Sequence, residues 1–248
     1  MLKDVSYVFL FLALLAEIIG TVGGFGSSVF FVPLANVYLD FNSVLGLTAL
    51  FHVFSNISKI TLFRKGLDRR LLINLGIPAV VFVIIGGLLT TLFKTSYLEV
   101  FLGLFLVSLS ILFLVRRNLT IRKSKLNAVI GGSLSGLFAG LLGTGGAIRG
   151  LTMASFNLRK NAFIATSAVI DLGVDTTRTF VYWHNGFITK ELLIFIPFLF
   201  VIGWLGTWIG KELLKEISQK SFKSISLYLI LLIGIFTLFK ALQSFYLQ

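Results

Sequence analysis

The stretch GTVGGFGSS, residues Gly20–Ser28, interrupts an apolar segment that runs from Val5 to Tyr38. A second glycine cluster, GLLGTGGAIRG at Gly140–Gly150, interrupts the apolar segment Leu126–Phe156 in the same way. Glycine lets a helix end and turn, and the turn leaves backbone polar groups without helical partners. A membrane tolerates such groups only against protein or a water-filled cavity. Each stretch therefore predicts either a kinked spanning helix or a re-entrant hairpin whose tip lies inside the membrane.

The composition indicates that the whole chain is a membrane domain. Of its 248 residues, 56% are hydrophobic and 13% are charged, whereas a soluble domain is about 45–50% apolar and about 25% charged. Apolar segments recur along the full length, so we expect one all-α polytopic domain over residues 1–248. The net charge of +12 is typical of basic cytoplasmic loops and does not require nucleic acid as a partner. Because there is no cysteine and the two histidines, His52 and His184, are far apart, we expect no metal site and no cofactor.

Six further apolar stretches have the length of a spanning helix, about 20 residues. They are Ser43–Phe63, Leu71–Phe93, Tyr97–Val115, Asn161–Trp183, Leu192–Gly210 and Phe222–Phe239.

Loop charge discriminates between the two interpretations of the glycine-broken stretches. If both stretches cross the membrane fully, the loop Lys and Arg residues divide twelve to seven between its sides. If both are hairpins, the division is fifteen to four, and the four are Lys3, Lys94, Lys190 and Lys240. Cytoplasmic loops carry the excess of Lys and Arg. We therefore favour two hairpins and six spans, with basic loops in the cytoplasm and both termini outside; two broken spanning helices are the alternative.

Under this topology the chain divides into two repeats, residues 1–118 and 124–248, each a hairpin followed by three spans. Three crossings per half invert the second repeat relative to the first. A duplication is supported independently, because at an offset of 119 residues Pro78 falls on Pro197 and Gly87 on Gly206.

The same offset aligns two polar stripes inside apolar helices. In each stripe the spacing i, i+4, i+8, i+11 places four side chains on one helix face. Charges near the centre of a spanning helix cost about 2.5–3.5 kcal/mol each, which favours a functional role. The matched sets are Thr48, His52, Asn56, Lys59 and Ser167, Asp171, Asp175, Arg178.

Inverted repeats with broken helices are a recurring architecture of secondary transporters. Here the second arms of the hairpins begin near Ser27–Ser28 and near Gly145–Gly146, so their N-termini point into the membrane. A helix N-terminus offers free N–H groups and a partial positive charge, which favours an anion. Arg149, beside the second tip, agrees with an anionic substrate.

The two glycine motifs, GTVGGFGSSVFFVPL (Gly20–Leu34) and GLFAGLLGTGGAIRG (Gly136–Gly150), together with TSAVIDLGVDTTR (Thr166–Arg178), resemble the sulfite exporter TauE/SafE family. The resemblance covers essentially the whole chain. It implies a multi-pass protein of a prokaryotic inner membrane that moves small sulfur-containing anions such as sulfite or sulfoacetate. It further implies coupling to protons and, as the favoured direction, export.

Candidate site residues fall into two groups. For substrate binding we expect cations, tip glycines and small polar groups: Arg149, Arg178, Lys59, Asn56, Thr144, Ser27, Ser28, Gly24, Gly145 and Gly146. For proton coupling we expect the titratable groups Asp171, His52, Asp175 and Glu17.

Each candidate also has a structural interpretation. Arg178 could form an ion pair with Asp175 or extend to the membrane interface, as could Lys59. Arg149 could pair with Asp171 or Asp175, and His52 could be a core histidine.

Other functions remain as alternatives. A passive anion channel or an uptake permease would share the basic tips. An intramembrane enzyme is disfavoured, because no nucleophile motif, cysteine or metal-ligand spacing accompanies His52 and Asp171. The sequence leaves the oligomeric state, monomer or homodimer, open.

Overall fold

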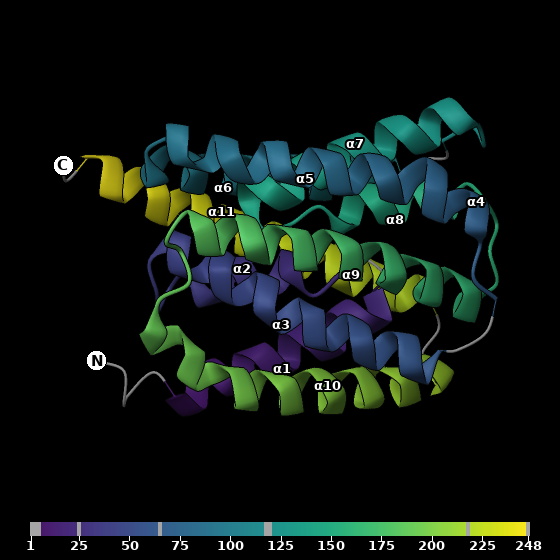
Figure 1. The fold of residues 1–248 in the computed structure, drawn as a ribbon, viewed down its shortest axis with the longest axis horizontal. Helices are drawn as coiled ribbons and strands as arrows, with labels where there is room; N and C mark the ends of the chain where they lie inside the picture. The colour runs from purple at the N-terminus through teal and green to yellow at the C-terminus, as the bar shows by residue number, and fades with distance from the viewer. Residues whose placement is uncertain (1–5, 24–25, 64–65, 117–120, 217–218, 247–248) are drawn as a thin grey trace.

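The computed structural model describes residues 6–23, 26–63, 66–116, 121–216 and 219–246, and every regular element in these ranges is a helix. The helices are α1 (Ser6–Gly23), α2 (Ser28–Ala35), α3 (Phe41–Leu62), α4 (Arg69–Leu71), η1 (Leu72–Gly76), α5 (Ile77–Leu89), η2 (Thr90–Leu92), α6 (Thr95–Val115), α7 (Lys125–Leu142), α8 (Gly146–Ala154), α9 (Lys160–His184), η3 (Lys190–Phe195), α10 (Ile196–Glu216) and α11 (Gln219–Tyr246). The long helices lie side by side along the longest axis of the molecule (Figure 1). The predicted all-α polytopic class is confirmed.

Five helical segments of the described chain are long and apolar enough to cross a membrane: Phe41–Leu62, Arg69–Leu92, Thr95–Val115, Lys125–Leu142 and Lys190–Glu216. Four of them match predicted spans. The fourth in the list, α7, is the first arm of the second glycine-broken stretch. The two remaining predicted spans form as α9, which carries three charges in its middle, and as α11, whose apolar part is Leu227–Gln243.

Both glycine-rich stretches end a helix and turn the chain back. Gly26 and Gly143 adopt φ angles of 83° and 74°, in the left-handed region that favours glycine. A Cβ added to Gly20 would overlap Ser27, and one added to Gly145 would overlap the Ser135 carbonyl. Residues seven and ten positions apart touch in this way only because α2 folds back beside α1, and α8 beside α7.

Helices α5, α7 and α9 run in the same direction, and α5 and α7 pack with their backbones in close contact. The glycines of α7 face η1 and α5 at a constant offset: Gly132 meets Leu75 of η1 and Gly140 meets Val83 of α5, so α7 runs parallel to this segment. Missing Cβ atoms let the backbones touch there. Helix α9 runs in the same direction, because its contacts with η1 and α5 also keep a constant offset: Ile170 with Gly76 of η1, then Gly173 with Val80 and Val181 with Gly87 of α5.

A second set shares the opposite direction. Gly206 and Gly210 of α10 meet Glu17 and Thr21 of α1, so these helices are parallel. Helix α3 joins them, because Ser58 bonds to Thr207 while Gly203 lies against Ser55. Between the sets, α3 and α9 are antiparallel: Asn56 bonds to Asp175, and His52 lies beside Arg178. The first and last described residues, on α1 and α11, lie at the same end of the molecule (Figure 1).

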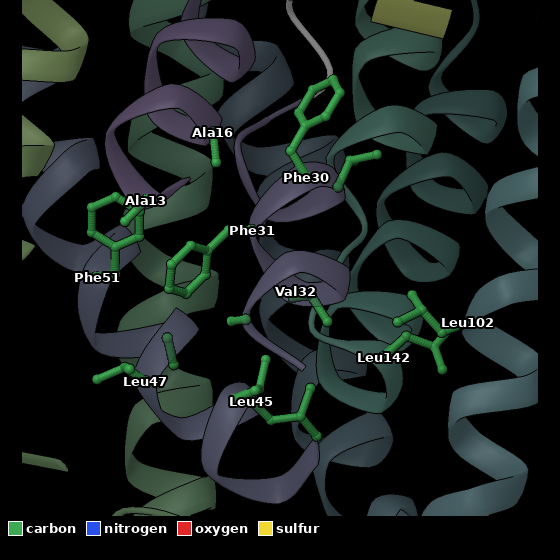
Figure 2. Close-up of a cluster of buried hydrophobic side chains, with 14 of the residues drawn as sticks. Ala13, Ala16, Phe30, Phe31, Val32, Leu45, Leu47, Phe51, Leu102 and Leu142 are labelled. Atoms are coloured by element: carbon green, nitrogen blue, oxygen red, sulfur yellow. The ribbon is translucent and has the colours of Figure 1, made fainter. Parts of the chain in front are cut away.

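The short helix α2 is enclosed by apolar side chains. Phe30, Phe31 and Val32 lie in a cluster with Leu45 of α3 and Leu142 of α7 (Figure 2). The outward faces of the long helices carry large exposed apolar residues, among them Ile73, Leu88, Phe198, Trp208 and Phe239. Such faces suit lipid. The polar groups gather inside.

Candidate functional site

The two predicted polar stripes face each other where α3 and α9 cross. Asn56 Nδ2 donates to Asp175 Oδ2 at 2.6 Å. His52 Nδ1 lies 3.9 Å from the same oxygen and 3.4 Å from Arg178 Nη2. The structure thus brings residues that are about 120 positions apart into direct contact.

Arg178 is buried, with 1% of its side chain exposed, so the expectation that it extends to the interface is wrong. Its Nε lies 2.8 Å from Asp175 Oδ1, and its Nη1 donates to the Gly143 carbonyl at 2.9 Å. Tyr182, one turn further along α9, donates to the Gly140 carbonyl at 2.7 Å. These bonds satisfy carbonyls at the end of α7, so Arg178 also holds the second glycine break in place.

Arg149 forms a salt bridge with Asp171, which is one of the two ion pairs that the sequence suggested for it. Its Nε also donates to Ser167 Oγ at 3.1 Å, and 4% of its side chain is exposed. Asp171 keeps 18% exposure. The pair therefore joins α8 to α9 at an accessible carboxylate.

Glu17 has the most hydrogen-bond donors of the buried carboxylates and is fully buried. Its carboxylate lies 2.8 Å from Lys59 Nζ, so Lys59 is held inward and does not extend to the interface. Four hydroxyls complete the shell, from Ser27 and Ser55 at 2.6 Å, Thr207 at 3.0 Å and Thr21 at 3.1 Å.

Sequence reasoning missed Ser55, Thr21 and Thr207 as partners of Glu17. Ser55 and Thr21 lie one helical turn from Lys59 and from Glu17, a spacing that could have suggested them. Thr207 is 190 positions from Glu17, and no local pattern indicates it.

The tips of the two broken helices meet at the same place. Ser28 Oγ donates to Thr144 Oγ1 at 3.3 Å, and a Cβ on Gly26 would lie 3.7 Å from Gly146 Cα. Ser27 and Gly145 occupy the positions before α2 and α8, and neither caps its helix with a side-chain hydrogen bond. The positive ends of both helices therefore point at the crossing of α3 and α9. Gly24 lies outside the described residues.

A small cavity lies between the tips and the polar stripes. Eleven predicted site residues line it: Ser27, Ser28, His52, Asn56, Lys59, Gly145, Gly146, Arg149, Asp171, Asp175 and Arg178. Thr144 reaches this lining through Ser28, and Glu17 stands behind Ser27 and Lys59. Within the described residues, no group of three His, Asp or Glu side chains is placed to hold a metal ion.

Comparison with known protein families gives a match over most of the chain. The family model for the sulfite exporter TauE/SafE matches residues 9–237. The chain belongs to the TauE/SafE family. The match includes both glycine breaks, both polar stripes and the cavity between them. Comparison with curated proteins and with solved structures gave no match.

Membership of the TauE/SafE family makes the chain a membrane transporter protein, not an enzyme, and implies transport of a sulfite-type anion. The predicted family is thereby confirmed.

Proposed function

We propose that this TauE/SafE protein is a secondary transporter that moves a small sulfur-containing oxyanion or organosulfonate, of the sulfite or sulfoacetate kind, across the cytoplasmic membrane. The observation that carries the proposal is the central cavity, which combines Arg149, Arg178 and Lys59 with two inward-pointing helix N-termini. Each half of the chain supplies one such N-terminus and at least one of these cations.

These groups suit an oxyanion of tetrahedral or pyramidal shape. A guanidinium presents parallel N–H groups that can bind two oxygens of one sulfonate or sulfite. The backbone N–H groups at the start of α8 can donate to a third oxygen, as can the hydroxyl of Ser28 when it turns away from Thr144. A carboxylate would fit the same donors less completely, because it has only two oxygens.

Proton coupling follows from the carboxylate partners of the cations. Asp171 forms a salt bridge with the guanidinium of Arg149, so an anion must compete with Asp171 for that guanidinium. A proton taken up by a titratable group beside the cavity offsets the charge of the anion and so eases that competition. His52 and Asp175 form an adjoining pair beside Arg178, which can hold a proton in the same way. A carrier of this kind is reversible, and in a cell that generates the anion it works as an exporter.

We propose further that the two halves are inverted repeats whose broken helices are re-entrant hairpins. In support, α1 and α3 of the first half run opposite to α7 and α9 of the second, and each short helix returns beside its first arm. The basic residues at helix ends also divide unequally. Arg69, Arg116, Lys125, Arg159 and Lys215 flank helices at one end, and Lys94, Lys190 and Lys240 lie at the other. The basic end is then cytoplasmic and both termini are outside.

Flux into proteoliposomes tests the function. Purified protein is reconstituted, and uptake of sulfite, sulfoacetate, methanesulfonate, thiosulfate and acetate is measured with and without a pH gradient. We expect saturable, gradient-dependent flux of the sulfur oxyanions and weak flux of acetate. Flux that neither saturates nor responds to the pH gradient would indicate a passive channel. No flux of any anion would contradict transport.

A further inference from the structure

The charged groups at the centre of the molecule balance one another. Among the described residues around the cavity, each cation is paired with one carboxylate: Lys59 with Glu17 at 2.8 Å, Arg178 with Asp175 at 2.8 Å, and Arg149 with Asp171. With a neutral His52, these six side chains carry no net charge. Buried charges are kept in proteins when they are paired in this way.

Glu17 differs from the other two carboxylates in its position. Asp171 and Asp175 line the cavity, whereas Glu17 does not. It is fully buried behind the lining, and it reaches the cavity only through Lys59 and Ser27, which do line it. Glu17 can therefore cancel the charge of Lys59 without touching a substrate.

An anion that enters a balanced, buried cluster adds one uncompensated negative charge. The free-energy cost of such a charge is comparable to that of breaking a buried ion pair. A proton that arrives with the anion restores the balance. Were Glu17 neutral, Lys59 would supply the missing positive charge, and no proton would be needed.

His52 is placed to take that proton. Its Nε2 lies 3.0 Å from Ser27 Oγ, which donates its own hydrogen to Glu17 at 2.6 Å. On the other side, Nδ1 faces Asp175 and the Arg178 guanidinium. The remaining charged groups around it are Lys59 of its own helix, Arg149 of α8 and Asp171 of α9, while α10 contributes the Thr207 hydroxyl to the Glu17 shell. An imidazolium at this position would have a carboxylate on each side, one of them reached through Ser27.

We propose that Glu17, by neutralising Lys59 from behind the cavity, makes the binding of each monoanion depend on the uptake of one proton, and that His52 accepts this proton. Glu17 is thus a positioning residue for coupling, not a contact of the substrate. The inference rests on the proposed function and specifies how the same site is coupled.

Proton uptake on binding tests the inference directly. Methanesulfonate and isethionate are suitable probes, because both remain monoanions through the working pH range and neither releases a proton of its own. Detergent-solubilised protein in weak buffer with a pH dye is titrated with each anion, and the affinity is measured from pH 5 to 9. For the wild type we expect one proton per anion, and an affinity that falls about tenfold per pH unit above the point where His52 loses its proton.

Variants of the ion pair separate coupling from structure. Glu17→Gln is expected to bind anion with no proton uptake and with an affinity independent of pH. The double variant Glu17→Gln with Lys59→Met removes both charges, leaves no unpaired cation, and is expected to take up one proton per anion again. Glu17→Asp keeps the charge and should therefore still take up one proton per anion.

The possible outcomes distinguish failure of the Glu17 coupling inference from failure of the proposed transport function. Wild-type protein that binds either anion without taking up a proton would overturn the inference and leave transport standing. So would Glu17→Gln with an unchanged proton count. The proton uptake of the double variant can be measured even if Glu17→Gln fails to fold. A double variant that binds anion without taking up a proton would also overturn the inference. If no anion of the flux panel binds to the wild type, the proposed function itself fails.

Discussion

The salt bridge between Arg149 and Asp171 joins the tip of a broken helix to a polar stripe, and under the proposed function an anion competes with Asp171 for Arg149. This position explains why Arg149 has two partners on α9, Asp171 and Ser167, and still lines the cavity. An anion oxygen can replace either partner without exposing the guanidinium to lipid.

Arg149→Gln should therefore weaken substrate binding. A charge-assisted hydrogen bond contributes about 1.5–3 kcal/mol, so we expect the half-saturation concentration for sulfite or methanesulfonate to rise about 10- to 100-fold. The measurement is concentration-dependent flux in proteoliposomes. Arg122→Gln, at an exposed position beyond the cavity, is the control and should leave the curve unchanged. An unaltered half-saturation concentration in Arg149→Gln would show that Arg149 is only a structural ion-pair partner.

Asp171→Asn should uncouple the flux from the proton gradient. The amide keeps the size of the side chain and its contact with Ser167, but it leaves Arg149 without a counter-charge, so an anion can bind without a proton. We expect anion flux to persist while its response to an imposed pH gradient disappears. Asp40→Asn is a matched control, because Asp40 caps the start of α3 and asparagine caps a helix equally well. Gradient-driven accumulation that survives in Asp171→Asn would show that the charge of Asp171 has no part in coupling.

At the scale of the elements, the sequence predicted the features that have a local cause. Glycine clusters identified both helix breaks, and the spacing of His52, Asn56, Asp171 and Asp175 identified the two stripes. The hydroxyl shell of Glu17 could not be predicted, because Thr207 joins it only when α10 packs parallel to α1. In the same way, nothing in the span around Arg178 indicates that its guanidinium bonds to carbonyls of α7.

The burial of Arg178 shows why position within a span is a weak guide. The sequence places it near the end of an apolar stretch, where a long side chain can reach the interface. Helix α9 continues to His184, however, and α3, α7 and the first residues of α8 surround the middle of that helix. Packing between distant segments decided the environment of this residue.

The close approach of α8 to α7 provides a prediction about the second hairpin. Gly145 lies where any Cβ would overlap the carbonyl oxygen of Ser135, so Gly145→Ala must push the two helices apart. Overpacking costs about 1–3 kcal/mol, and here it also displaces the tip that carries Arg149. We expect a lower unfolding temperature in detergent and a flux reduced at least about tenfold.

Gly173→Ala is the control for that variant. A Cβ at Gly173 of α9 would meet only the end of the Val80 side chain, at 3.2 Å, and a side chain can shift by a few tenths of an ångström. The variant should transport nearly as the wild type. Equal behaviour of the two alanine variants would mean that the hairpin contact is not needed for transport.

At the scale of the whole molecule, the two opposed sets of helices account for the position of the site. Because α3 and α9 are antiparallel, their polar stripes meet near the middle of both helices, halfway between the two ends of the bundle. Both broken helices bring their tips to the same level. A site at this level suits the proposed carrier, because alternating access requires a central site that can open to either side of the membrane.

Membrane topology offers a test of this architecture, and the absence of cysteine from the sequence makes single-cysteine labelling direct. Leu67 lies exposed between α3 and α4, and Thr189 lies exposed between α9 and η3. If both broken helices are re-entrant, Leu67→Cys and Thr189→Cys lie on opposite sides of the membrane. If each broken helix is a full crossing, the two cysteines lie on the same side.

We expect an impermeant maleimide added to intact cells to label Thr189→Cys and Gln243→Cys, near the C-terminus, but not Leu67→Cys. Permeabilised cells should expose Leu67→Cys as well, which controls for its reactivity. The same-side result for Leu67 and Thr189 would contradict the inverted repeat, because an even number of crossings in each half leaves both halves in the same orientation. Labelling of Leu67→Cys alone in intact cells would instead keep the repeat and reverse its orientation, and with it the assignment of the basic end to the cytoplasm.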